Sequence, residues 1–248
     1  MGVRGKSLLG TAATTRRAPL YPDIGEALSN KESTPRMSRK FKQAIQCYDR
    51  ALALNPLIAT IWTNKGVALG VLGRYKESLA AYDRAIRISP NLARTWYNRG
   101  ITLSEFGWHE ESLVSFERML ALDPGYPAGW TMKGNELHLL GRHLEALVCF
   151  EQATTINPRD AGAWTDSGIE LGTLGRHLEA IVCFDRAIAV NPKYAEASYN
   201  KGIALIECSL LREALACFEG ADRLGHPLAM GQIANCRSRL RLRYSNPV

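Results

Sequence analysis

A period of 34 residues constrains this chain more than any other feature of its sequence. Five of the eleven prolines recur at that interval, at Pro56, Pro90, Pro124, Pro158 and Pro192. Glycine recurs in the same way at Gly66, Gly100, Gly134, Gly168 and Gly202, and tryptophan at Trp62, Trp96, Trp130 and Trp164. Self-similarity at a period of about 20 to 50 residues is the signature of a repeat architecture. The chain is therefore built from repeated units, and length alone does not set its number of domains.

Each unit is predicted to be a pair of helices. In the first full unit, apolar residues follow a helical spacing twice, first at Trp62, Val67, Leu69 and Leu72, and again at Leu79, Tyr82, Ala85, Ile86 and Ile88. Gly73 lies between the two stretches and suits the left-handed residue that commonly follows a helix end. The second stretch ends before Pro90, because the residue before proline disfavours the helical conformation. We therefore expect helices over 59–72 and 75–88 with equivalents every 34 residues, about twelve in all, and no strand.

Two further positions of the unit are predicted to be small and buried. The glycine of each unit and the small residue twelve positions later, such as Gly134 and Ala146, are expected where the two helices cross. Leucine at Gly134 should then overpack the crossing. Cysteine occupies one position of the second helix in four units, at Cys47, Cys149, Cys183 and Cys217, where it is expected to act as a small hydrophobic residue. Without a CxxC pair or a secretory signal, these cysteines favour a reduced intracellular setting.

The units resemble tetratricopeptide repeats in their period and in their Trp, Gly, Leu, Ala, Phe and Pro positions. The resemblance covers five units, 59–92, 93–126, 127–160, 161–194 and 195–228. It implies an all-α, right-handed solenoid of stacked antiparallel helix pairs. Residues 37–58 form a partial unit with a second helix only, and residues 229–243 are expected to form a capping helix. Residues 1–36 are expected to be a basic, disordered tail, and residues 244–248 a short C-terminal tail.

The charge of the chain is concentrated at its ends. The net charge is +7, and residues 1–40 contribute +5, residues 229–248 contribute +4, and the remainder contributes −2. A nearly neutral array whose tryptophans hold core positions does not favour nucleic-acid binding. The basic N-terminus leaves three interpretations open: a targeting segment, a disordered tail or a start set too far upstream. No stretch is apolar enough to span a membrane, and a cytoplasmic location is expected.

No catalytic motif is found, so a non-enzymatic protein without a cofactor is expected. His109, His143 and His177 recur with the repeat, and equivalent residues of a solenoid lie too far apart to share a metal ion. These histidines are expected to open the second helices, as Tyr75 does in the first unit.

The function implied by the resemblance is binding of an extended or short helical peptide of a partner protein along the first helices. The alternative is a recognition module of an enzyme or regulator whose catalytic domain lies elsewhere. The partner and the oligomeric state remain open. The candidate groove residues are Asn64, Arg94, Tyr97, Asn98, Thr131, Asn135, Thr165, Asp166, Glu196, Tyr199, Asn200 and Glu207. Asn64, Asn98 and Asn200 share one repeat position, where an amide can both donate to and accept from a peptide backbone. Acidic residues outnumber the one cation, Arg94, so we expect a ligand with Lys or Arg at one end.

Overall fold

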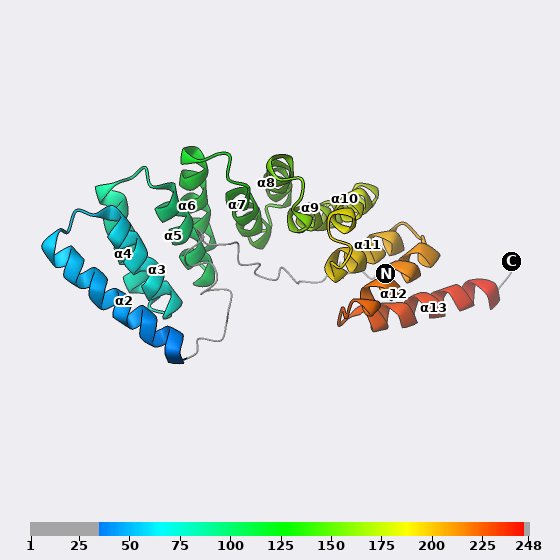
Figure 1. Cartoon of the computed structure of the whole chain (residues 1–248). Helices are drawn as coiled ribbons and strands as arrows, with labels where there is room; N and C mark the ends of the chain where they lie inside the picture. The colour runs from blue at the N-terminus through cyan, green and yellow to red at the C-terminus, as the bar shows by residue number, and fades with distance from the viewer. Residues whose placement is uncertain (1–34, 246–248) are drawn as a thin grey trace, which may run out of the picture. The chain divides into compact units, whose positions relative to one another are not determined.

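The structure is a computed structural model that describes residues 35–245 (Figure 1). This part of the chain contains twelve α-helices and no strand. The helices are α2 (Pro35–Leu54), α3 (Ala59–Val71), α4 (Tyr75–Ile88), α5 (Ala93–Glu105), α6 (His109–Leu122), α7 (Pro127–Leu139), α8 (His143–Ile156), α9 (Ala161–Thr173), α10 (His177–Val190), α11 (Ala195–Glu207), α12 (Leu211–Arg223) and α13 (Ala229–Ser245). The expected all-α fold is confirmed, and in the first full repeat the expected helix 75–88 is found as stated, while the expected helix 59–72 ends one residue earlier, at Val71. The expected N-terminal tail lies almost wholly outside the described residues.

The chain divides into two compact units. The N-terminal unit ends at Gly141 and contains α2 to α7, and the C-terminal unit begins at Arg142 and contains α8 to α13. Within each unit, the first helix of a repeat packs on its own second helix, as α3 does on α4 and α11 on α12. Each second helix also packs on the first helix of the next repeat, as α4 does on α5 and α10 on α11. Each unit is therefore a stack of neighbouring helix pairs.

A hydrogen bond links the tryptophan and the proline that share the repeat. The indole Nε1 of Trp62 donates to the carbonyl oxygen of Pro56 at 2.9 Å, and Trp164 donates to Pro158 at 3.0 Å. The same bond occurs in the two repeats between them. The proline ends one second helix, and the indole ties that turn to the start of the next first helix. This explains why both residues recur at the same interval.

In four of the five full repeats, the glycine at Gly66, Gly100, Gly168 and Gly202 faces an aromatic ring. A Cβ on Gly100 would lie 2.8 Å from Cε1 of Phe116, and one on Gly66 would lie 2.6 Å from Cε1 of Tyr82. The aromatic residue sixteen positions later thus fills the space beside the glycine. The small residue twelve positions later lies close to the glycine, as expected where the two helices cross, because Ser112 Oγ donates to the carbonyl of Gly100 at 2.9 Å. The contact of Gly134 with Ala146 stays a prediction.

Ion pairs also connect consecutive repeats. A basic residue just before the glycine reaches an acidic residue sixteen positions earlier, on the preceding second helix. The pairs are Lys65–Asp49 at 2.5 Å, Arg99–Asp83 at 3.0 Å, Lys133–Glu117 at 3.2 Å and Lys201–Asp185 at 2.5 Å. Each acidic partner is about half exposed. Ion pairs at the surface individually contribute little to the free energy of unfolding. Their shared spacing shows that consecutive repeats pack on one another in the same register.

The turn between the two helices of a repeat requires a left-handed residue. Gly73, Gly107 and Gly175 have φ values of +73°, +81° and +76°. At the equivalent position in the last repeat the residue is Ser209, with a φ of +62°. A side chain in this region places Cβ near the following carbonyl oxygen, and the cost is about 1 kcal/mol.

Ser209→Gly is therefore expected to raise the free energy of unfolding by about 1 kcal/mol, because glycine adopts the left-handed conformation without the steric cost. Denaturant unfolding of both proteins, followed by circular dichroism, measures the change. The reciprocal variant Gly175→Ser should lose a similar amount. Equal stability of Ser209→Gly and the unmodified protein would contradict the assignment of strain to this turn.

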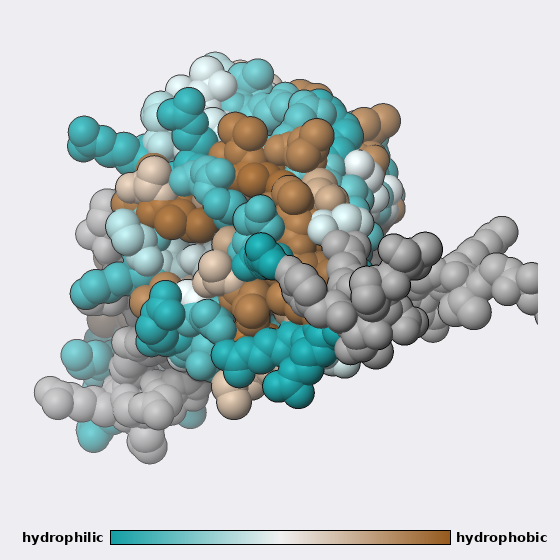
Figure 2. All heavy atoms as spheres, turned by 90° about the vertical axis from the view of Figure 1, so that its right-hand side faces the viewer, coloured by the Kyte–Doolittle hydropathy of each residue, from teal (hydrophilic) through white to brown (hydrophobic). Residues whose placement is uncertain are grey.

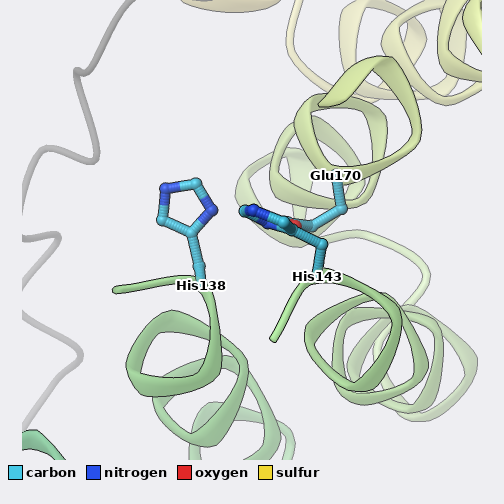
Figure 3. A group of neighbouring side chains, drawn as sticks. All are labelled: His138, His143 and Glu170. Carbon is cyan, nitrogen blue, oxygen red and sulfur yellow. The ribbon is translucent and has the colours of Figure 1, made fainter. Parts of the chain in front are cut away.

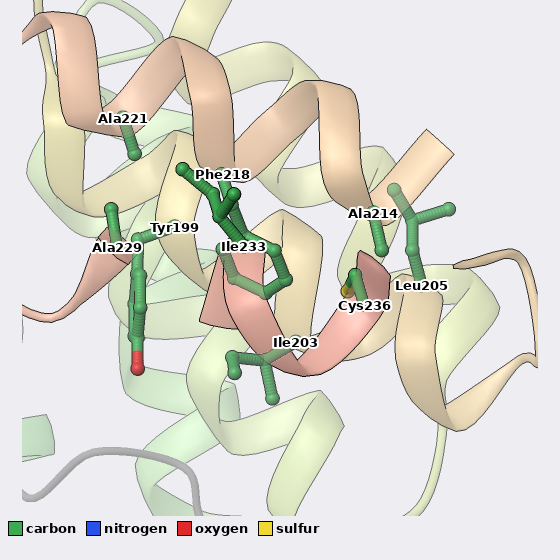
Figure 4. Close-up of a cluster of buried hydrophobic side chains, with 9 residues drawn as sticks. All are labelled: Tyr199, Ile203, Leu205, Ala214, Phe218, Ala221, Ala229, Ile233 and Cys236. Carbon is green, nitrogen blue, oxygen red and sulfur yellow. The ribbon is translucent and has the colours of Figure 1, made fainter. Parts of the chain in front are cut away.

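Helix α13 covers the last repeat, as expected of a capping helix. Ala229, Ile233 and Cys236 of α13 are buried against Tyr199 and Ile203 of α11 and Phe218 and Ala221 of α12 (Figure 4). Cys236 holds the position at which the five full 34-residue repeats carry glycine. Because glycine leaves the space that the aromatic ring of a second helix enters, a cysteine there closes the array.

Candidate functional site

The candidate groove residues lie on the first helices of both units. In the N-terminal unit they are Asn64 on α3, Arg94, Tyr97 and Asn98 on α5, and Thr131 and Asn135 on α7. In the C-terminal unit they are Thr165 and Asp166 on α9, and Glu196, Tyr199, Asn200 and Glu207 on α11. Neighbouring first helices contact each other, α3 with α5, α5 with α7, and α9 with α11. The sequence positions therefore share one helical layer within each unit.

The two tyrosines of the candidate set lie in hydrophobic cores. Tyr97 is fully buried and makes edge-to-face contacts with Phe116 and Tyr126, with ring centroids 5.9 and 5.4 Å apart. Tyr199 packs on Phe218 in the core beneath α13. Both tyrosines therefore pack in the interior of the array and expose little surface to a ligand.

Asn98 has an unusual environment for an amide. Its side chain is 2% exposed, and among the described residues neither Oδ1 nor Nδ2 has a hydrogen-bond partner. A buried polar group without a partner costs about 1 to 3 kcal/mol. Asn98 thus carries unused donor and acceptor capacity on α5, between α3 and α7.

Asn200 occupies the same repeat position as Asn98 and is paired. Its Nδ2 donates to Oε1 of Glu196 at 3.2 Å, and Oε2 of Glu196 lies 3.3 Å from Nε2 of His226. His226 stacks on Tyr199 at 4.0 Å, and its Nδ1 accepts from the backbone N–H of Leu228 at 3.3 Å. Because Nδ1 accepts, Nε2 carries the proton and donates to Glu196. Burial raises the pKa of the Tyr199 hydroxyl above its ordinary value.

The remaining candidates differ in what their side chains do. Thr165 and Thr131 donate to carbonyl oxygens of their own helices, at Ala161 (2.8 Å) and Pro127 (3.3 Å). Asn64, Asn135 and Asp166 are half-buried, and Glu207 is exposed.

Two histidine–carboxylate pairs join consecutive repeats and were not anticipated. His109 opens α6, as expected, and its Nδ1 lies 2.8 Å from Oε2 of Glu136 on α7. His143 opens α8, and its Nδ1 lies 2.9 Å from Oε2 of Glu170 on α9 (Figure 3). Both glutamates are almost completely buried. The signal in the sequence was a glutamate recurring after 34 residues, 27 positions after each histidine.

The cysteines confirm the expectation of a small buried position in part. Cys149 is buried, and burial raises the pKa of the half-buried Cys183 thiol to about 11. The thiol of Cys183 therefore stays protonated at neutral pH and is a poor nucleophile. Cys47, by contrast, is exposed. The expectation is wrong for Cys47, because no described helix covers that side of α2.

Hydrophobic side chains also reach the surface on second helices. Leu144 and Val148 on α8, and Leu178 and Val182 on α10, are each more than half exposed. Figure 2 shows one face of the molecule, on which hydrophobic residues, in brown, gather among hydrophilic ones, in teal. Between residues 35 and 245, no helix combines the length and the apolar composition that crossing a bilayer requires.

Comparison with known proteins finds matches to family models and to solved structures. Three family models, each described as a tetratricopeptide repeat, match residues 38–93 and 165–226, residues 81–113, and residues 127–160. Among curated protein sequences none matches.

Two solved structures illustrate the similarity of the fold. One is YrrB, described as a TPR protein with an unusual peptide-binding site. It is 24% identical, with a TM-score of 0.66, over 74% of this chain and 96% of YrrB. The other is MamA from Desulfovibrio magneticus RS-1, starting at its residue 41. It is 20% identical, with a TM-score of 0.63, over 67% of this chain and 94% of MamA.

Proposed function

Because the chain belongs to the tetratricopeptide-repeat family, we propose that it is a protein–protein interaction scaffold whose first helices bind a segment of a partner protein. The segment is extended or a short helix, and it runs across α3, α5 and α7. In the C-terminal unit, the first helices α9 and α11 form a separate row of contacts.

The observation that carries the proposal is the unpaired amide of Asn98. A peptide backbone offers a carbonyl and an N–H at each residue, which are the two partners that Nδ2 and Oδ1 lack. Because Asn98 is only 2% exposed, its amide must turn toward the surface to meet the peptide, and the two hydrogen bonds then formed would each contribute about 1 kcal/mol. Asn64, at the same position of the preceding repeat, is half-buried and extends the row.

The C-terminal unit is expected to contribute charge more than backbone contacts. The amide of Asn200 already bonds with Glu196, and Glu196 also contacts His226. Asp166 and Glu196 are half-buried and Glu207 is exposed, all on first helices. These acids favour Lys or Arg in a segment that binds to α9 and α11. Because the charges are partly exposed, this preference should weaken as salt screens it.

Asn98→Leu is expected to lower the affinity for a selected peptide at least about tenfold, which corresponds to roughly 1.4 kcal/mol. The free energy of unfolding should stay the same or rise, because an unpaired buried amide is replaced by an apolar side chain of similar size. A peptide array selects the ligand with the unmodified protein, and fluorescence anisotropy measures both variants.

The control is Gln152→Leu, an exposed position of α8 that lies on a second helix. It should leave the affinity unchanged. If Asn98→Leu bound the selected peptides as tightly as the unmodified protein, the amide would have no part in binding, and the proposal would lose its main support.

A further inference from the structure

Helix α2 is a second helix that lacks the first helix of its own repeat among the described residues. In the next repeat, Ser78, Tyr82 and Ala85 of α4 are buried, because α3 covers them. The equivalent residues of α2 are Ala44, Tyr48 and Ala51, and each is only partly buried. The other side of α2 packs on α3 through Phe41, Ile45 and Tyr48.

The uncovered face can be defined residue by residue. Lys40, Ala44, Cys47, Ala51 and Leu54 follow each other at spacings of three or four and share one side of the helix, which we name the α2 strip. Leu54 is 90% exposed, whereas Leu122, Ile156, Val190 and Leu224 at the same repeat position are 39–40% exposed. Cys47 is exposed, while Ala81, Ser115 and Cys149 at its repeat position are buried. Leu54 and Cys47 of the strip are thus more exposed than the residues at the same positions of the later repeats.

The repeat indicates what shape covers such a surface. In the other repeats the covering element is a helix that presents a glycine to the aromatic ring, as Gly66 does to Tyr82. Tyr48 holds the position of Tyr82. A helix covering α2 therefore needs glycine, or another very small residue, where it crosses Tyr48.

The charge around the strip indicates which charge the covering helix should carry. Lys40 lies within the strip, Arg50 flanks it, and both are exposed. The one acidic residue of α2, Asp49, lies on another side of the helix and pairs with Lys65 of α3 at 2.5 Å. A helix laid on the strip thus meets positive charge that no acid of α2 offsets.

We propose that the α2 strip is a second interaction surface, which binds an acidic amphipathic helix of a partner protein and so completes the first repeat. The bound helix places its small residue over Tyr48, its apolar residues against Ala44, Ala51 and Leu54, and its acidic residues toward Lys40 and Arg50. This surface is separate from the first-helix layer, and its test does not depend on that proposed function.

The chain supplies a suitable probe. An acetylated and amidated peptide with the sequence of residues 160–173 carries three acids and no base, and its Gly168 faces the aromatic Phe184 in the array. The full chain is treated with iodoacetamide, with and without the peptide, and alkylation of each cysteine is followed by mass spectrometry. At a peptide concentration ten times its dissociation constant, Cys47 should react about tenfold more slowly. Cys208, which lies in the C-terminal unit, should react at an unchanged rate.

Two changes test the fit of the helix. A peptide with Gly168→Leu should give no protection of Cys47, because leucine cannot cross the Tyr48 ring. In the protein, Ala51→Glu should abolish protection by the original peptide, since it adds bulk and negative charge to a partly exposed position. A thermal melt of this variant that matches that of the unmodified protein excludes unfolding as the cause.

Three results would overturn the proposal. In the first, Cys47 without peptide reacts as slowly as the buried Cys149, which would mean that another part of the chain covers the strip. In the second, the Cys47 rate falls as the protein concentration rises, which would assign the strip to a second copy. In the third, neither peptide protects Cys47 or both protect it equally, which would remove the requirement for a small residue.

Discussion

Gly168→Leu is expected to lower the free energy of unfolding by about 3 kcal/mol or more, the largest effect of any single substitution considered. A Cβ at Gly168 would lie 2.5 Å from Cε1 and 2.8 Å from Cζ of Phe184. Phe184 is fully buried and packs with Leu147, Leu171 and Ala204, so the ring has no free space into which it can move. Because small domains have a total stability of about 5 to 15 kcal/mol, the loss should be visible as a clearly lower melting temperature.

A matched control separates the steric effect from a general effect of replacing glycine. Gly231 lies in α13, and a Cβ there would meet nothing within 4 Å. Gly231→Ala should therefore stabilise the protein by about 0.5 to 1 kcal/mol, as alanine does in helix interiors. Gly168→Ala, which adds only a Cβ, should also lower the stability of the protein. Combining it with Phe184→Leu removes the ring that the Cβ meets, so the double variant should recover part of that loss. An unchanged melting temperature for Gly168→Leu would mean that the two helices do not cross as described.

The fold could be predicted because the same helix-ending and packing residues recur in every repeat. A proline that stops one helix, a glycine that turns the chain and a glycine that admits an aromatic ring act within about 34 residues of each other, and five repeats remove chance agreement. Sequence spacing shows that the glycine position must be small but does not show which neighbours require it. In the repeats described here the aromatic residue sixteen positions later requires it.

The candidate site was less predictable, because its chemistry depends on contacts between repeats. Asn98 and Asn200 are equivalent in sequence, and the structure leaves the first unpaired and pairs the second with Glu196. The difference comes from the residue four positions earlier, Arg94 in one repeat and Glu196 in the other, and from His226, which lies 30 residues after Glu196. Because Glu196 and His226 are 30 residues apart, no pattern within a single helix predicts their contact.

The second large expected effect concerns the buried carboxylate of Glu136. His109→Ala is expected to lower the free energy of unfolding by about 2 kcal/mol. Removing one partner of a buried pair leaves the other without compensation, which costs about 3 to 5 kcal/mol when both are fully buried. Glu136 is 2% exposed but His109 is 31% exposed, so water offsets part of that cost. Denaturant unfolding followed by circular dichroism measures the loss.

The chain itself supplies the controls for this pair. In the preceding repeat the two positions are held by Tyr75 and Thr102, a neutral combination, so the double variant His109→Tyr with Glu136→Thr should recover most of the lost stability. In a later repeat, His177 has Ala204 at the partner position, and His177→Ala should cost less than about 0.5 kcal/mol. The two single substitutions remove the same side chain from the same place in the repeat. A similar loss from both would therefore show that the histidine stabilises its own helix, and that its bond with Glu136 contributes little to holding consecutive repeats together.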